Sequence, residues 1–145
     1  MGYPSLASLA RALANRETSS AEHVETLISR TAAHAALGGY VGFNPELLRA
    51  QARAADSRRS AGETAPLLSV HIALKDNIDA VGWPTSVGTT ALLNNKPSRD
   101  AAVTERLRGA GALVSGKANM HELAFGITNH NRVTGIACNP WAADR

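Results

Sequence analysis

The sequence predicts an α/β protein in which a helical layer comes first and parallel strands follow. Before residue 62, apolar residues recur every three or four positions, which is the spacing of amphipathic helices. After that point, two short apolar runs flank a further helical segment. A strand, a helix and a second strand in this order form a βαβ unit with parallel strands. We therefore expect one domain over residues 1–145, with a helical layer at 1–62 and the start of a central sheet at 63–145.

The helical layer is predicted to contain three helices, two of them with a recognisable cap. Leucines recur at helical spacing after Ser5. Ser19 and Glu22 have the spacing of a capping box, in which each side chain accepts a bond from the other residue's backbone N–H. Asn44 is a good cap and Pro45 fits the first helical position after it. The predicted helices span about residues 5–14, 20–36 and 45–58, and the pair Gly38-Gly39 ends the second.

The most abrupt change of chemistry in the chain occurs at Lys75. The apolar run Val70–Leu74 has the length and β-branched content of a buried parallel strand, and the lysine follows it directly. Open α/β sheets place ligands and catalytic groups at the carboxyl ends of their strands. Desolvation there favours the neutral amine, which can act as a base or a nucleophile. The structural alternative is a lysine that extends into solvent and pairs with Asp76.

A helix and a second strand complete the predicted βαβ unit. Asp100 is placed to cap this helix. The inward face of the helix is predicted to carry Ala101, Val103, Leu107 and Ala110. Residues 110–115 then have the character of a second buried strand.

The composition excludes several classes of function. The 145 residues are 44% hydrophobic and 19% charged, as in ordinary globular domains. The net charge is only +3 and aromatic residues make up 4%, so we expect no nucleic-acid partner. No apolar run is long enough to span a bilayer, and no secretory leader is recognisable. A single cysteine fits a reducing compartment, and we therefore expect a cytoplasmic protein that does not bind membranes.

Four sequence blocks, taken in order, carry a family resemblance. They are Ile72–Asp79 around the lysine, Gly82–Ser86, Gly116–Gly126 and Asn139–Arg145. Together they resemble the amidase signature family, closely in the second half of the chain and loosely in the helical first half. The third block looks most like the branch that contains mandelamide and indoleacetamide hydrolases. The resemblance implies a mixed central sheet flanked by helices, of which this chain is the N-terminal portion only.

The resemblance also implies a Ser–cisSer–Lys triad in which Lys75 is the lysine. A serine hydroxyl needs a base to become a nucleophile, and a neutral lysine acting through a second serine supplies one. The family places both serines in a glycine- and serine-rich segment, and no Gly-Gly-Ser-Ser-Gly-Gly run occurs in this sequence. Neither Ser86 nor Ser115 lies in a matching context. The serines are therefore expected beyond Arg145, and the 145 residues alone are predicted to be inactive.

Residues near the lysine are candidates for supporting roles. Asp76 and Asn77 are predicted either to orient Lys75 and hold the strand-end turn or to serve only as turn residues. In the family, the region around Met120 and Phe125 lies beside the substrate cavity, so these two are candidate pocket walls, with a place in the core as the alternative. The pair His121-Glu122 lacks the second histidine of a zinc motif, and the resemblance implies neither a metal nor a cofactor.

Two positions depart from the family pattern just before the lysine. Ser69 stands where the family commonly has glycine, and His71 stands where it commonly has proline. A buried imidazole needs hydrogen-bonding partners, so His71 is expected either to pair with a neighbour or to accompany a slightly rearranged strand.

Other interpretations stay open. The same blocks occur in the amidase subunit of tRNA-dependent amidotransferases, although the form of Lys117–Ala124 favours the hydrolase branch. A different class of interpretation is a non-catalytic truncated remnant, or a fragment that depends on a partner. Two parallel strands are too few for a covered sheet, and their exposed sides favour homo-oligomers or other self-association.

Overall fold

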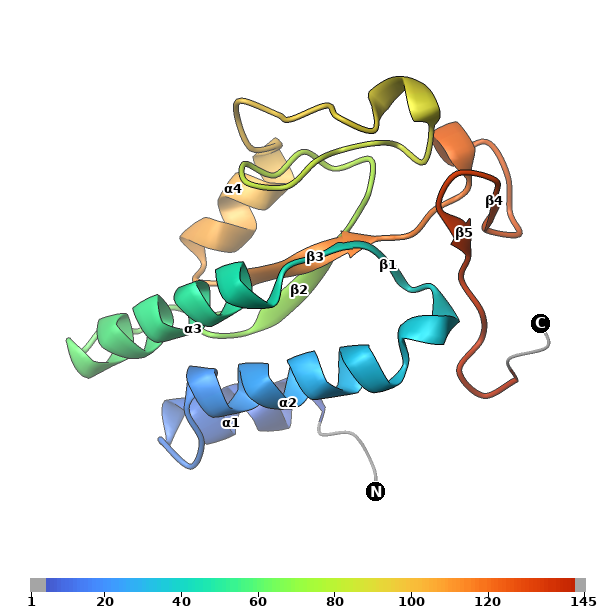
Figure 1. The fold of residues 1–145 in the computed structure, drawn as a ribbon. Coiled ribbons are helices and arrows are strands. Elements are labelled where there is room, and N and C mark those ends of the chain that lie inside the picture. Colours follow the sequence, from blue (N-terminus) through green and yellow to red (C-terminus); the bar gives the residue numbers. More distant parts are fainter. Residues whose placement is uncertain (1–4, 143–145) are drawn as a thin grey trace.

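The computed structural model describes residues 5–142, and its elements alternate between helices and short strands (Figure 1). The helices come mostly first, and the strand that carries Lys75 follows the third of them. The order is α1 (Leu6–Ala14), α2 (Ser20–Ala33), η1 (Ala35–Leu37), β1 (Tyr40–Phe43), α3 (Pro45–Ser60), β2 (His71–Lys75), η2 (Thr90–Leu92), α4 (Ala102–Gly109), β3 (Leu113–Ala118), η3 (Glu122–Ala124), β4 (His130–Asn131) and β5 (Gly135–Ile136).

The second and third N-terminal helices begin at the predicted caps, and the first, expected from its leucine spacing, spans Leu6–Ala14. The Ser5 hydroxyl accepts from the Ser8 amide, and Ser19 and Glu22 form both bonds of the capping box. The Asn44 side chain accepts from the Leu47 amide at the start of α3. Only the end of α2 differs from the prediction, because residues 35–37 form the separate turn η1, which Gly38 closes in a left-handed conformation.

The main sheet is mixed, as the family resemblance implied. Its strand order is β1-β3-β2, with β2 parallel and β1 antiparallel to the central strand β3. The parallel pair confirms the predicted βαβ unit. Strand β1 was not predicted, and it lies within the segment expected to be helical. It packs closely against β3, since a Cβ at Gly116 would lie 2.4 Å from the Gly42 oxygen and 2.8 Å from the Tyr40 ring.

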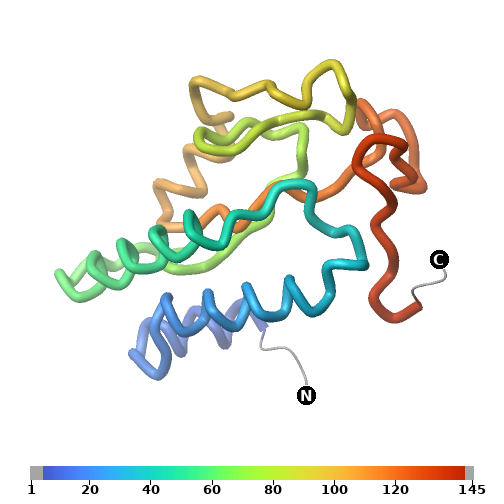
Figure 2. The backbone as a smooth tube through the Cα atoms, viewed as in Figure 1, coloured from blue at the N-terminus to red at the C-terminus, as the bar shows by residue number. Residues whose placement is uncertain are grey.

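Helices cover the two faces of this sheet unequally (Figures 1 and 2). On one face, α2 and α3 pack over the sheet in a cluster that includes Val24, Leu48 and Leu113. On the other face, α4 and the long segment after β2 pack over it in a second cluster. Because side chains alternate along a strand, His71, Ala73 and Lys75 point toward the α2 face.

The details of α4 differ from the prediction. Its N-cap residue is Ala101 rather than Asp100, and it has no side-chain cap. Asp100 instead accepts from the Val81 amide at 2.6 Å and pairs with Arg108 at 3.0 Å, so it ties the helix to the preceding loop. Val103, expected to face inward, is 46% exposed. The following strand begins at residue 113 rather than 110, because the helix end and Gly111, at φ +94°, occupy the earlier positions.

The segment after β3 is largely irregular and carries exposed apolar side chains. The short turn η3 lies inside it, between the candidate pocket residues Met120 and Phe125. The exposed fractions of Phe125, Ile127 and Trp141 are 91%, 101% and 88%. Asp144 and Arg145, which complete the fourth family block, lie outside the described residues. Among residues 5–142, no helix has the length and apolar character needed to cross a membrane.

Candidate active site

The parallel strands β2 and β3 end side by side, and the candidate site lies at this edge. Lys75, the last residue of β2, pairs in register with Ala118, the last residue of β3. The chain then turns at Asp76, whose amide donates to the Ala118 oxygen at 3.1 Å. The Ile78 amide donates to the Lys75 oxygen at 2.9 Å and closes the turn. These bonds fix the backbone that carries Lys75.

Lys75 is exposed rather than desolvated among the described residues. The expected burial of this side chain is therefore not seen, and Ala73 on the same sheet face is exposed as well. The alternative ion pair with Asp76 is also not formed within residues 5–142. Strand alternation sends Asp76 to the opposite face, where its carboxylate meets Lys117 instead.

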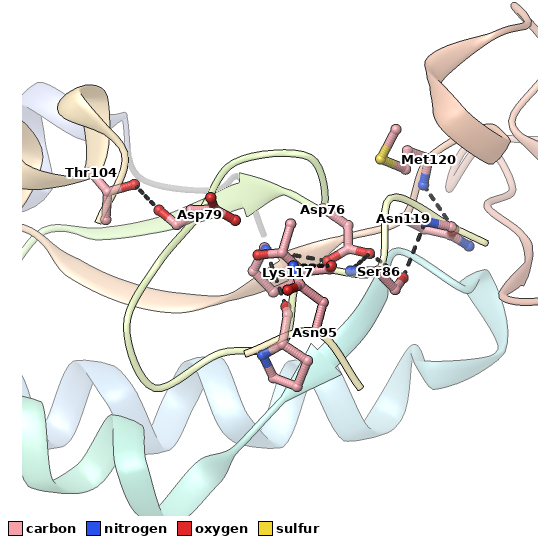
Figure 3. Close-up of polar contacts among 11 residues, drawn as sticks. Asp76, Asp79, Ser86, Asn95, Thr104, Lys117, Asn119 and Met120 are labelled. Carbon is pink, nitrogen blue, oxygen red and sulfur yellow. Dashed lines mark hydrogen bonds and ion pairs between the residues drawn. The ribbon is translucent and has the colours of Figure 1, made fainter. Parts of the chain in front are cut away.

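The desolvated lysine of this edge is Lys117, on β3. Its side chain is 1% exposed and that of Asp76 is 2% exposed (Figure 3). The Lys117 Nζ lies 3.2 Å from the Asp76 carboxylate, 2.8 Å from the Thr85 hydroxyl and 3.1 Å from the Pro84 oxygen. An ammonium has three donors and no acceptor, so these three partners saturate it. We call this group, Asp76, Pro84, Thr85, Ser86 and Lys117, the strand-end clamp.

The second carboxylate oxygen of Asp76 completes the clamp. It accepts from the Ser86 amide at 3.1 Å and from the Ser86 hydroxyl. The Val87 amide donates to the Asp76 backbone oxygen at 3.2 Å, and the Gly88 amide donates to the Ser86 hydroxyl at 3.1 Å. The turn after β2 is thereby bonded on both sides to residues 85–88.

Two electrostatic effects act on Lys117 in opposite directions. Burial lowers the pKa of Lys117, because removing an ammonium from water is costly, while the Asp76 carboxylate acts to raise it. The net effect lowers the pKa of Lys117. Its Nζ pairs with the Asp76 carboxylate at 3.2 Å and donates to the Pro84 oxygen and the Thr85 hydroxyl, so the clamp holds it on three sides. We therefore treat Lys117 as a structural group of the clamp.

Two buried asparagines hold the chain that follows β3. The Asn119 amide group donates to the Gly38 oxygen at 3.0 Å, and its oxygen accepts from the Met120 amide at 2.8 Å. The Asn131 amide group donates to the Gly88 and Met120 oxygens at 2.9 and 3.0 Å. These bonds connect residues 119–120 and 131 to the loop that the clamp holds.

The remaining predicted site residues lie in different environments. Asn77 is exposed beside Lys75 at the strand end. Met120 is 2% exposed and packs inside the protein, whereas the Phe125 side chain is 91% exposed. The structure thus brings Lys75, Asp76 and Asn77 together at one edge, while Phe125 extends into solvent.

A cavity of about 560 Å³ lies between α2 and the sheet, on the face to which Lys75 points. Its walls include Tyr40. Tyr40 on β1 and Lys75 on β2 both pair with Ala118, from opposite sides of β3. The walls of the cavity also include His71 and His23, whose ring nitrogens lie 2.9 Å apart. His71 has therefore found the partner that a buried imidazole needs. Burial, with a smaller effect of His23, lowers the pKa of His71 to about 4.

The backbone at Ser69 explains why glycine would suit this position. Its φ is +78°, in the left-handed region that glycine adopts without strain. The serine is fully buried, and its hydroxyl bonds the Ser20 hydroxyl at 2.5 Å and accepts from Arg59 at 2.9 Å. These bonds offset part of the backbone cost.

Comparison with known proteins identifies the family. The amidase family model matches residues 22–145, most of the chain. The chain belongs to the amidase signature family. In the described part of the chain, no group of three or more His, Cys, Asp or Glu side chains is placed to hold a metal ion.

Relatives carry several names within this family. The chain is 43% identical over 141 residues to the A-type subunit of the glutamyl-tRNA(Gln) amidotransferase of Cupriavidus metallidurans, covering 97% of this chain and 28% of that protein. It is 39% identical over 137 residues to the indoleacetamide hydrolase of Allorhizobium ampelinum, covering 94% and 29%. The crystal structure of the peptide amidase from Stenotrophomonas maltophilia superposes with a TM-score of 0.85 at 31% identity, covering 94% and 30%. The chain thus spans less than a third of the length of these relatives.

Sequence reasoning missed the role of Lys117. The predicted strand ended at Ser115, so Lys117 was placed after the strand and not within it. The strand continues to Ala118, and the irregularity in its pairing with β2, between Ile72 and Ala73, places Lys117 opposite Leu74 on the Asp76 side of the sheet. The only local signal is that a lysine also follows the second apolar run, three residues after Val114.

Proposed function

We propose that this chain supplies the lysine base of an amidase that hydrolyses a carboxamide to the acid and ammonia. The observation that carries the proposal is the position of Lys75. It ends a parallel strand at the edge where α/β enzymes place catalytic groups, on a turn held by buried bonds, in a chain of the amidase family. An arylacetamide or mandelamide-like substrate fits the block at residues 116–126.

The proposed mechanism uses Lys75 as a general base acting through a serine. Its neutral amine accepts a proton from the bridging serine, which takes one from the nucleophilic serine. The nucleophile attacks the amide carbon, and the ammonium of Lys75 returns a proton by the same route as ammonia leaves. Water then hydrolyses the acyl-serine. Asp76 and Asn77 hold the turn that carries the base.

Both serines of this scheme belong to a segment that the 145 residues do not contain. The exposed position of Ala73 and Lys75 leaves room for such a segment on the α2 side of the sheet. Covering this face would remove water from Lys75 and favour its neutral form. We therefore propose that residues 1–145 are inactive by themselves.

The test begins with the coding DNA that follows the codon for Arg145. The proposal expects an in-frame continuation into a Gly-Gly-Ser-Ser-Gly-Gly-like run. The longer product should release ammonia from phenylacetamide, and Lys75→Ala should abolish the release. Clear lysine-dependent turnover by residues 1–145 alone, or full activity of the Lys75→Ala longer product, would contradict the proposal.

A second candidate is an amidotransferase A-type subunit. The identity of 43% to such a subunit supports it, compared with 39% to the indoleacetamide hydrolase. The two candidates differ in substrate and in dependence on partners. Ammonia release from glutamine only when partner subunits are present would favour the amidotransferase, and release from phenylacetamide by the single protein would favour the hydrolase.

A third candidate is a non-catalytic chain that depends on a partner. The exposed side chains of Phe125, Ile127 and Trp141 support it, because large apolar groups on a surface favour association. Concentration-dependent sedimentation of residues 1–145 would favour this candidate. A sharp two-state monomer would count against it.

A further inference from the structure

We propose that Lys117 is a positioning residue for Lys75, acting through the strand-end clamp. The proposal rests on the proposed role of Lys75 as the base. Lys117 lies on the opposite face of the sheet from Lys75 and touches neither the substrate side nor that lysine. It acts instead on the turn to which Lys75 is attached.

The first support is the cost of burying this charge. A buried ammonium and a buried carboxylate each lose their hydration, and their attraction commonly only balances that loss. Apolar residues of similar volume often give equal or greater stability at such a place. The Lys117–Asp76 pair, at 1% and 2% side-chain exposure, is therefore poorly explained by stability alone.

The second support is the number of chain segments that the clamp joins. Lys117 belongs to β3, Asp76 to the turn after β2, and residues 84–86 to the loop beyond it. An apolar side chain could fill the space but could not bond all three. Because Asp76 directly follows Lys75, fixing its carboxylate fixes the direction in which the chain leaves the strand.

The third support is that the two ends of the same strand pair are held differently. At the amino end, the Leu113 amide donates to the Val70 oxygen at 2.8 Å beside an apolar cluster. At the carboxyl end, the charged clamp lies beside the apolar cluster of Leu74, Ala80 and Trp83, and the Asp76 and Ile78 amides donate to the Ala118 and Lys75 oxygens. Loss of the clamp is therefore expected to loosen one end of the strand pair and leave the other intact.

The experiment measures amide hydrogen exchange at both ends in residues 1–145. In Lys117→Met, the Asp76 carboxylate loses its cation, and the protection of the Asp76 and Ile78 amides should fall at least about tenfold relative to Leu113. Leu13→Ala, a buried change on α1 outside both apolar clusters, is the matched control. It should lower protection at both ends without changing their ratio.

The double variant Asp76→Asn/Lys117→Met separates positioning from stability. It removes both buried charges, so the free energy of unfolding should return close to that of the unchanged chain. The Asp76 and Ile78 amides at the carboxyl end of the strand pair should still exchange faster. If Lys117→Met alone does not fold, amide exchange is measured in the double variant instead. The proposal would be overturned if the double variant kept the protection of Asp76 and Ile78 relative to Leu113 unchanged. It would also be overturned if protection fell equally at both ends of the strand pair. Neither result depends on turnover, so the role of Lys75 is tested separately.

Discussion

Folding stability should fall as the pH falls from about 6.5 to 4, because of His71. Burial lowers the pKa of His71 to about 4 from the ordinary value of 6.5, and the pKa of His23 is also lowered by burial. In this window the unfolded chain binds a proton that the folded chain excludes. The contribution of His71 is therefore complete above pH 6.5 and is lost progressively as the pH falls toward 4.

The magnitude follows from the shift. Each pH unit inside the window corresponds to about 1.4 kcal/mol, so going from pH 6.5 to 5 costs up to about 2 kcal/mol for His71 alone. Solvent screening at this partly buried site reduces the figure to about 1 to 2 kcal/mol. Arg30, on the same helix as His23, lowers the pKa of His23 further.

The assay is urea unfolding followed by circular dichroism at pH 7 and pH 5. The unchanged chain should lose about 1 to 2 kcal/mol of unfolding free energy between the two. His71→Gln should lose clearly less, whereas the control His130→Gln, at an exposed position, should behave like the unchanged chain. An identical pH dependence in His71→Gln and the unchanged chain would refute the reasoning.

Two further predictions concern other buried groups. Ser69→Gly should be less destabilising than Ser69→Ala by about 1 kcal/mol in urea unfolding, since both lose the bonds to Ser20 and Arg59 but only glycine relieves the φ of +78°. Equal stabilities would show that the backbone strain is negligible. Trace acetylation with acetic anhydride should label Lys117 at least about a hundredfold more slowly than the exposed Lys96, because reaction of a 1%-exposed amine requires local opening. Comparable acetylation rates of Lys117 and Lys96, measured by peptide mass spectrometry, would show that Lys117 is not enclosed by the clamp.

The helices could be predicted because their signals are local. The caps at Ser19 and Asn44 are formed by residues within three positions of each other, and the structure contains both. The exception, Asp100, shows the limit of a local signal. Its carboxylate accepts hydrogen bonds from the Val81 amide, in a distant loop, and from Arg108, at the far end of the helix.

The strand β1 and the clamp could not be predicted because their partners are distant in sequence. A strand of four residues that contains Gly42 has little propensity of its own, and it exists because β3 offers a partner and Gly116 leaves room for the Tyr40 ring. The clamp depends on the register of β2 against β3, including an irregularity between Ile72 and Ala73. No pattern within one segment reports that register.

The most direct test of Lys75 is a chimera in which residues 1–145 replace the corresponding segment of the indoleacetamide hydrolase of Allorhizobium ampelinum, 39% identical over 137 residues. Ammonia release from indoleacetamide would be measured for the chimera and for its Lys75→Ala and Lys96→Ala variants, with circular dichroism to verify folding. We expect an active chimera, full activity in Lys96→Ala and loss of activity by at least about a hundredfold in Lys75→Ala. A folded Lys75→Ala chimera that keeps its activity would contradict the assignment of Lys75 as the base.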